Sequence, residues 1–345
     1  MNDALTFHLG TPKSGTTSLQ GILSHNRERL RKAGYLYPGS NPSHFIEVLG
    51  LRDGGFRGHS YAAADGAWEG LVAEVGRHRG PVLVSHEILG GSKQTVVKQA
   101  VTSFPGRPLR AVITCRDLGR QLPAAWQEGV KNGDTESYAE FLDAALAGWT
   151  GPGAARGFWR GQNLVTIARR WAKHVGAENL LLVTVPSPGA DPDVLWQRFR
   201  EAAGLPEIDY DLPAATRNPS LGAVETELLR RIVSSLPDDV PWPVYTRQVK
   251  RRLAQRELVQ RQAGGPITVP ERYRARIAEI QAEMLDAVRE AGYPVVGSLD
   301  DLTPAYRSDG VSPDEVSDSA LLERALEVMA PMVLRDKPGR RGSSG

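Results

Sequence analysis

The chain of 345 residues has one cysteine, Cys115, and no long run of apolar residues. A single cysteine excludes an intramolecular disulfide and a multi-cysteine zinc site, and it fits a reducing compartment, so we expect a cytoplasmic protein. A membrane-spanning helix needs about 18 or more consecutive apolar residues, and a secretory leader needs a charged and then an apolar stretch. The sequence therefore predicts neither a membrane span nor secretion.

The chain also has little excess charge of either sign. Lys and Arg number 42 and Asp and Glu number 40, so the net charge is +2, which gives no reason to expect a nucleic-acid-binding protein. Hydrophobic residues make up 41% and charged residues 24%, as in a globular protein with a sizeable core. The sequence shows no cluster of metal-ligand residues, so we expect no metal cofactor.

Apolar runs typical of strands alternate with helical patterns through the first two thirds of the chain. The strand-like runs are 5–9, 34–37, 81–85, 109–115 and 179–185. Their alternation with helices predicts an α/β fold with a central parallel sheet flanked by helices. After residue 237 the strand signals stop, and helical patterns continue near 244–258, 270–291 and 319–329. We therefore expect an α/β domain over 1–236, a C-terminal helical extension over 237–336 packed on it, and a disordered basic tail over 337–345.

The segment His8-Leu-Gly-Thr-Pro-Lys-Ser-Gly-Thr-Thr17 joins the first strand to an amphipathic helix. Unpaired backbone amides and the dipole at such a helix start favour a phosphate or a sulfate. Gly10 and Gly15 are spaced as in a Walker P-loop, but Thr16 stands where that motif has lysine, and the lysine of this loop is Lys13. The displaced lysine argues against metal-assisted hydrolysis of a nucleoside triphosphate and leaves anion binding intact.

This loop resembles the 5′-phosphosulfate loop of the sulfotransferases that use 3′-phosphoadenosine 5′-phosphosulfate (PAPS). The matching residues are Pro12, Lys13, Ser14, Gly15, Thr16 and Thr17. The resemblance, to bacterial sulfotransferase-family proteins in particular, covers about residues 5–235 and implies the three-layer fold of P-loop NTPases. It also implies transfer of a sulfuryl group from PAPS to a hydroxyl, less readily to an amine, of a carbohydrate or specialised metabolite. In such an in-line displacement Lys13 would neutralise the charge that develops on the leaving group.

A second part of the resemblance follows the strand 109–115. Arg116 would lie at the carboxyl end of this strand, where open α/β sheets bind ligands, and its guanidinium can hold a phosphate in a bidentate manner. In the sulfotransferase family an arginine here and a serine eight residues later bind the 3′-phosphate, but this chain has Ala124 at the second position. Candidates to replace the missing hydroxyl are Arg120, Gln121 and Gln127. Arg217 is placed in chain order like the late basic loop that closes over the nucleotide.

The strand 81–85 delivers His86 and Glu87 to the same edge of the predicted sheet. Small-molecule sulfotransferases use a histidine after this strand as the general base and heparan-type enzymes use a glutamate, so the resemblance implies either residue. Neighbouring side chains on a strand point in opposite directions, so one of the two is expected to face the reacting atom, and the sequence does not choose. His44, in the long segment 38–60, and Trp159, in 149–160, are candidates to bind the acceptor.

Two other functions stay open at this stage. A P-loop kinase would share the fold and the loop but would use ATP and magnesium, against which the absent lysine at position 16 counts. A non-catalytic nucleotide-binding or scaffold protein would use the helical extension for assembly. Neither the acceptor nor the oligomeric state has a signal in the sequence.

Overall fold

The computed structural model describes residues 3–52, 55–56, 58–150, 157–212, 220–261 and 264–335, which form two compact units. Unit 1 comprises Met1–Gln121, Ala144–Arg217 and Glu271–Ala305, and unit 2 comprises Leu122–Asp143, Asn218–Pro270 and Tyr306–Gly345. The expected boundary at residue 236 lies inside unit 2. Residues 271–305, which we expected in the C-terminal extension, belong to unit 1. The expected disordered tail, 337–345, lies outside the described residues.

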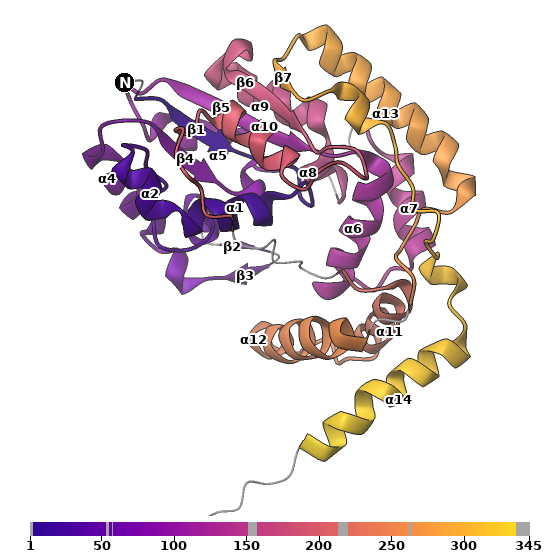
Figure 1. Ribbon diagram of the computed structural model, residues 1–345. Coiled ribbons are helices and arrows are strands. Elements are labelled where there is room, and N and C mark those ends of the chain that lie inside the picture. Colours follow the sequence, from indigo (N-terminus) through magenta and orange to yellow (C-terminus); the bar gives the residue numbers. More distant parts are fainter. Residues whose placement is uncertain are drawn as a thin grey trace, which may run out of the picture. The chain divides into compact units, whose positions relative to one another are not determined.

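Unit 1 contains a five-stranded sheet in which every neighbouring pair is parallel. The strand order is β4-β1-β5-β6-β7, as Figure 1 shows. The bounds are Leu5–His8 for β1, Val82–Ser85 for β4, Leu109–Cys115 for β5, Leu180–Thr184 for β6 and Val295–Val296 for β7. The predicted α/β class with a central parallel sheet flanked by helices is therefore confirmed.

Two details of the sheet differ from the expectation. The predicted strand 34–37 forms a single bridge, from Leu36 to Val82, beside β4. Strand β7 was not predicted, because its two residues follow Gly292-Tyr-Pro294 in a polar stretch without a strand-like pattern. This strand completes the sheet because its backbone pairs with Leu182 and Val183 of β6.

Helices cover both faces of the sheet (Figure 1). On one face α1 (Thr16–His25), α2 (Arg27–Lys32) and α10 (Val194–Ala203) share a core with strand side chains such as Leu83 and Val112. On the other face Trp171 of α9 (Leu164–Val175) lies against Phe7 of β1, with ring centroids 5.1 Å apart. Because side chains alternate along a strand, His8 lies on the first face, where its ring is 4.6 Å from that of Phe199.

The other elements of unit 1 lie between these strands in the chain. They are α3 (Phe45–Leu51), β2 (Gly55–Phe56), β3 (His59–Ser60), η1 (Ala62–Ala64), α4 (Ala67–Arg77), η2 (Glu87–Leu89), α5 (Gln94–Thr102), α8 (Trp159–Gln162), η4 (Ala177–Asn179), α13 (Glu271–Ala291) and η7 (Leu299–Leu302). The segment 38–60, expected as an irregular surface segment, thus contains helix α3, whose Val48, Leu49 and Leu51 are buried.

Unit 2 is helical among its described residues. It contains α11 (Ala223–Ser234), α12 (Trp242–Tyr245), η5 (Thr246–Leu258), η6 (Val259–Arg261), η8 (Pro313–Glu315) and α14 (Asp318–Arg335), while α6 (Leu118–Lys131) and α7 (Tyr138–Ala147) have residues in both units. The helix expected near 244–258 is present, but η5 is wound as a π-helix. The buried carboxylate of Glu225 pairs with Arg324, 3.1 Å away.

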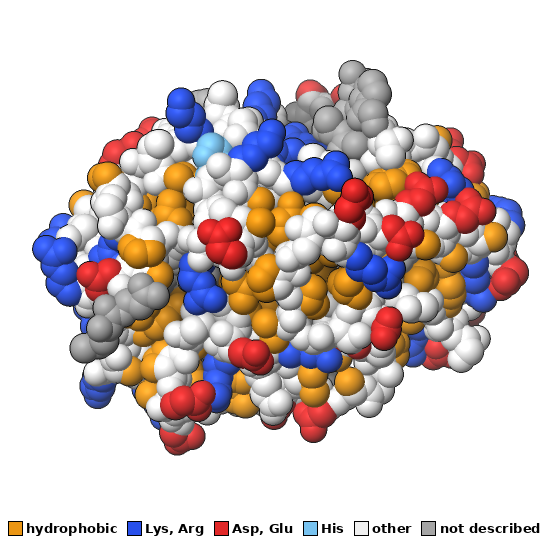
Figure 2. Space-filling model, turned by 90° about the horizontal axis from the view of Figure 1, so that it is seen from above, with side chains coloured by type: hydrophobic (Ala, Val, Ile, Leu, Met, Phe, Trp, Pro, Cys, Tyr) orange, Lys and Arg blue, Asp and Glu red, His pale blue; other side chains and the backbone are white. Residues whose placement is uncertain are grey.

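Charge is distributed evenly over the surface in view. Figure 2 shows acidic, basic and apolar side chains interspersed on one face, in keeping with the net charge of +2. Among the described residues, no helix combines the length and apolar character that a membrane span requires, and no group of three or more His, Cys, Asp or Glu side chains could hold a metal ion.

Candidate functional site

The loop between β1 and α1 has an unusual backbone. Gly10, Lys13 and Gly15 have φ angles of 52°, 70° and 88°, and Lys13 is the one non-glycine residue in the described part of the chain with a positive φ. Such strain in a non-glycine residue is concentrated at functional sites. A Cβ at Gly10 would lie 2.3 Å from Cγ2 of Thr16, so only glycine fits there.

The loop presents backbone amides at the start of α1. Gly15 is the N-cap of α1, and its carbonyl accepts from the amides of Ser18 and Leu19. The amides of Thr16 and Thr17, at the first two helical positions, have no acceptor within the helix. The side chain of Thr16 is buried and that of Thr17 is exposed. A helix start of this kind favours an anion, so the donor site predicted at this loop stays a prediction.

Ser14 braces the loop from inside. Its amide and its hydroxyl both donate to the carbonyl of Thr11, at 3.1 and 2.6 Å. Because its one hydroxyl proton is used there, Oγ of Ser14 accepts from the hydroxyl of Thr114, 2.7 Å away. Oγ1 of Thr114 then accepts from Nε2–H of His8 at 3.2 Å. The hydroxyl of Ser14 is therefore used inside the loop and is not available for the predicted contact with the donor. The backbone amide of Ser14 is also used, because it donates to the carbonyl of Thr11.

His8 continues this buried chain of hydrogen bonds to the neighbouring strand. Its Nδ1 accepts from the hydroxyl of Ser85 at 2.8 Å, and Oγ of Ser85 accepts from Nε2 of Gln20 at 3.1 Å. Burial, with a smaller effect of His86, lowers the pKa of His8 to about 3, so the ring is neutral. In this chain of hydrogen bonds Nδ1 of His8 accepts and Nε2 donates, so the ring must be neutral with its proton on Nε2.

Two amide side chains hold the loop from its other side. Nε2 of Gln121 and Nε2 of Gln162 both donate to the carbonyl of Pro12, at 2.7 and 2.8 Å. Gln121 also donates to Oε1 of Gln162 at 2.8 Å and to Oγ1 of Thr11 at 3.2 Å. Gln121, a candidate to bind the donor, is 1% exposed, and its side-chain amide donates to the loop and to Gln162.

Arg116 follows β5, beside the loop. One of its terminal nitrogens donates to the carbonyl of Lys13 at 3.3 Å, and its Nε is buried without a hydrogen-bond partner. Burial and the nearby Arg120 lower the pKa of Arg116 to about 10, so the guanidinium is charged at neutral pH. A buried guanidinium N–H group without an acceptor is costly unless an anion satisfies it.

Arg120 is held mainly by protein groups. Its Nε donates to the buried carboxylate of Asp117, and a terminal nitrogen donates to the carbonyl of Pro186 at 2.9 Å. Asp117 also accepts from the amide of Ala305 at 3.0 Å. The second terminal nitrogen of Arg120 is buried without a partner, so this one N–H₂ group is what Arg120 can offer to a ligand.

His86 and Glu87 differ in what their side chains can do. Nδ1 of His86 accepts from the amide of Ile88 at 3.1 Å, which places the proton of the neutral ring on Nε2. Burial lowers the pKa of His86. Oε2 of Glu87 is buried, has no hydrogen-bond partner and lies 3.9 Å from Nε2 of His86. The carboxylate can therefore take up a proton, whereas both ring nitrogens of His86 are occupied.

Two of the predicted acceptor contacts are opposed by the structure. Both ring nitrogens of His44 have backbone partners, because Nδ1 accepts from the amide of Ser85 at 2.9 Å and Nε2 donates to Pro38 O at 3.0 Å. Burial lowers its pKa to about 4. Trp159 is 2% exposed and donates to the carbonyl of Ala145 at 2.6 Å. Both side chains are buried, and their polar atoms are bonded to the backbone. Arg217 lies outside the described residues.

The comparisons with known proteins are sparse. No protein-family model matches the chain, and no curated protein matches it. A solved structure, the crystal structure of a sulfotransferase from Alicyclobacillus acidocaldarius, is similar over 60% of this chain and 83% of that chain, with 17% sequence identity and a TM-score of 0.40. At this identity and score, the likeness concerns the backbone arrangement and assigns no activity to this chain.

Sequence reasoning missed the residues that hold the site in shape. His8, Thr114 and Gln162 are buried and bond to the loop or its neighbours. The first two have a signal in the sequence, because each is a polar residue near the carboxyl end of a predicted strand. Gln162 has none, since it precedes helix α9 far along the chain and meets Pro12 only through the fold.

Proposed function

We propose that the protein transfers the sulfuryl group of PAPS to a hydroxyl of a carbohydrate or a specialised metabolite. The observation that carries this proposal is the loop of Gly10 to Thr17, in which a strained lysine and the free amides of a helix start lie beside the buried guanidinium of Arg116. This arrangement suits a ligand with two separate anionic groups, as a nucleotide with a 5′-phosphosulfate and a 3′-phosphate has.

Each part of the loop has a role in this proposal. The amides of Gly15, Thr16 and Thr17 bind the phosphosulfate, and Arg116 binds the 3′-phosphate through the Nε–H group that has no partner in the protein. The oxygen of the acceptor forms a bond to sulfur while the bond from sulfur to the 5′-phosphate oxygen breaks. Lys13 neutralises the charge that develops on this leaving oxygen.

Glu87 is the general base of the proposed reaction. The acceptor hydroxyl must lose its proton as it attacks, and the carboxylate of Glu87 has an oxygen without a partner that can take it up. His86 accepts a backbone hydrogen bond through Nδ1 and carries its proton on Nε2, so its neutral ring has no nitrogen left to accept one. We assign His86 the role of positioning the carboxylate, whose Oε2 lies 3.9 Å from Nε2.

A transfer assay with labelled PAPS and a panel of acceptors tests the activity. We expect Lys13→Ala to lower turnover by about 10²-fold or more, while Lys98→Ala, an exposed lysine on α5, leaves it unchanged. Equal turnover in the two variants would contradict the role of Lys13.

Thermal unfolding in the presence of ligands tests the donor, because a ligand that binds the folded state raises the melting temperature. Stabilisation by 3′-phosphoadenosine 5′-phosphate without magnesium supports the proposal, and stabilisation by ATP with magnesium alone would favour a kinase.

The choice of base has its own test. Removal of a general base costs about 10²- to 10⁴-fold in rate, so Glu87→Gln should lower turnover by that factor with little change in donor binding. His86→Gln, which can keep an acceptor toward the amide of Ile88, should lower it much less. The reverse order of the two variants would show that the histidine is the base.

A further inference from the structure

Helix α14 of unit 2 carries a row of exposed apolar side chains, which we call the α14 stripe. Its members are 58% to 74% exposed, whereas the next most exposed large apolar side chains in the described part of the chain, Leu212 and Val244, are 38% exposed. The stripe consists of Leu322, Leu326, Met329 and Val333. Single apolar residues are ordinary on a surface, but several gathered on one helix are typical of an interaction surface.

The spacing of the stripe places its members on one side of the helix. They follow one another at intervals of four, three and four positions. Because an α-helix turns by about 100° per residue, these intervals keep the four side chains within about 60° of one another around the helix. Alternating intervals of three and four are also those of the a and d positions through which two helices pack in a coiled coil. The pattern is therefore suited to a second helix.

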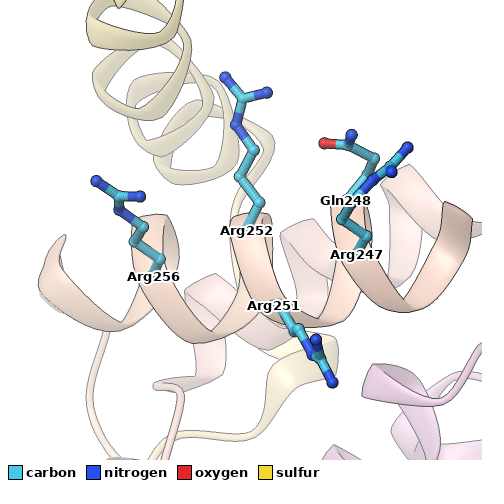
Figure 3. A pocket seen from close by; sticks show the side chains of 5 residues that line it. All are labelled: Arg247, Gln248, Arg251, Arg252 and Arg256. Carbon is cyan, nitrogen blue, oxygen red and sulfur yellow. The ribbon is translucent and has the colours of Figure 1, made fainter. Parts of the chain in front are cut away.

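The arginines of η5, which border an open hollow of about 350 Å³ in unit 2, lack such a common side (Figure 3). Arg251 leaves that helix on the side opposite to Arg252 and Arg256, so these three guanidinium groups do not share one face. On α14, in contrast, all four apolar side chains can contact one partner at the same time.

A different side of α14 packs within unit 2. The helix lies against α11, where Arg324 pairs with the buried carboxylate of Glu225 at 3.1 Å. On this side Leu321 and Val328 are buried, about a third of a turn from the centre of the stripe. Helix α14 is thus apolar on two sides, and only the packing on α11 shows which apolar residues stay exposed.

We propose that the α14 stripe pairs with the α14 stripe of a second copy of this chain, with the two helices antiparallel. The intervals four, three and four read the same in both directions, so the stripe is complementary to itself under a twofold rotation. Such a rotation places Leu326 against Met329 of the other copy and Leu322 against Val333. A surface that matches itself in this way is what a dimer with twofold symmetry requires.

The charges beside the stripe favour the antiparallel order. Asp318 and Glu323 are exposed and stand at the positions that flank the stripe on its two sides. In a parallel pair, Asp318 of each copy would face Glu323 of the other, and like charges repel. In the antiparallel pair Glu323 faces Ala330 instead, so this repulsion is absent.

Other partners fit the stripe less well. The residues that follow α14 in the chain, 336–345, include no large apolar side chain that could cover it. Helices that lie on a membrane surface have Lys and Arg beside their apolar side, which attract anionic lipids. The exposed charges next to this stripe are acidic and include Glu323 and Glu327. A second copy of the chain therefore suits both the spacing and the charge.

Sedimentation equilibrium of the full chain tests the pairing. Four side chains per copy make a small interface, so we expect the average molar mass to rise from one chain toward two between about 1 and 200 μM. Leu326→Glu with Met329→Glu places like charges against each other and should keep the chain monomeric over this range. The matched control adds the same charge at exposed positions of unit 1, as Ala73→Glu with Gln197→Glu, and should associate like the native chain. A native chain that stays monomeric, or equal association of the two double variants, would overturn the proposal.

Engineered cysteines test the orientation, since the native Cys115 is buried and does not compete. When the Leu322→Cys and Val333→Cys chains are mixed and oxidised, antiparallel pairing brings the two new thiols together. We expect a covalent dimer in the mixture and little in either variant alone. Efficient crosslinking of each variant with itself would show a parallel pair and overturn the antiparallel order. Leu326→Glu with Met329→Lys should restore association, because opposite charges then meet across the antiparallel pair.

Two controls separate the remaining explanations. Circular dichroism and thermal unfolding, at a dilution where the native chain is monomeric, should be the same for Leu326→Glu with Met329→Glu, because both side chains are exposed. Flotation with vesicles of phosphatidylcholine and phosphatidylserine tests a membrane partner. Binding to vesicles by the native chain that this variant loses, without self-association in solution, would overturn the choice of a second copy. None of these measurements needs a donor or an acceptor, so the inference stands or falls independently of the proposed function.

Discussion

Thr114 is the midpoint of the buried hydrogen-bond chain beneath the anion-binding loop, and its substitution tests whether that chain holds the loop in place. Its hydroxyl accepts from Nε2–H of His8 at 3.2 Å and donates to Oγ of Ser14 at 2.7 Å. Thr114→Val keeps the shape of the side chain but removes both bonds. All three residues are fully buried, so no water can replace the lost partner without rearrangement.

The size of the effect follows from these contacts. Each lost hydrogen bond costs about 0.5–1.5 kcal/mol, and the N–H group of His8, left buried without an acceptor, adds about 1–3 kcal/mol. We expect Thr114→Val to lower the free energy of unfolding by about 3 kcal/mol. Thr114→Ser keeps the hydroxyl and loses one methyl group, so it should cost about 1 kcal/mol.

Urea-induced unfolding of the native chain and the two variants measures these differences. A double-mutant cycle with Ser14→Ala adds a second readout, because residues in one network should show a coupling of more than about 0.5 kcal/mol. The valine variant should also bind 3′-phosphoadenosine 5′-phosphate more weakly than the serine variant, since Ser14 is part of the loop. If the valine and serine variants are equally stable, the hydrogen-bond chain does not stabilise this part of the fold and the reasoning is wrong.

Two further predictions concern the same region. Burial lowers the pKa of His8 to about 3 and of His44 to about 4, so below the ordinary value near 6.5 the unfolded chain binds more protons than the folded one and stability falls as pH falls. As the pH falls from 6.5 to about 4, each histidine should lower the free energy of unfolding by about 3 kcal/mol. Chemical unfolding at several pH values measures this change, and a free energy that stays constant over the range would contradict the prediction. Gly10→Ala should be more destabilising than Gly66→Ala, by a margin that thermal unfolding can resolve. Both glycines have positive φ, at 52° and 71°, but a new Cβ meets Thr16 at 2.3 Å in the first case and open space in the second. Equal losses would mean that backbone strain alone restricts position 10.

The local elements were the most predictable part of this protein. Strand β5 has the bounds that its apolar pattern predicts, because that pattern is read over seven positions. Strand β7 and the bridge at Leu36 were not predictable as observed, since each depends on a neighbouring strand and not on its own few residues.

The sequence by itself determined that a strand, a glycine-rich loop and a helix follow one another at the N-terminus, because backbone conformation there depends on neighbouring residues. It also placed Arg116, His86 and Glu87 after apolar strands, at one edge of a parallel sheet. Only the tertiary structure decided what each side chain is free to do. Nδ1 of His86 accepts from the amide of Ile88, and Oε2 of Glu87 is buried without a hydrogen-bond partner. Gln162 reaches the carbonyl of Pro12 from 150 residues away. Hydrogen bonds and burial join residues that are distant in the chain, and a pattern of neighbours cannot encode them.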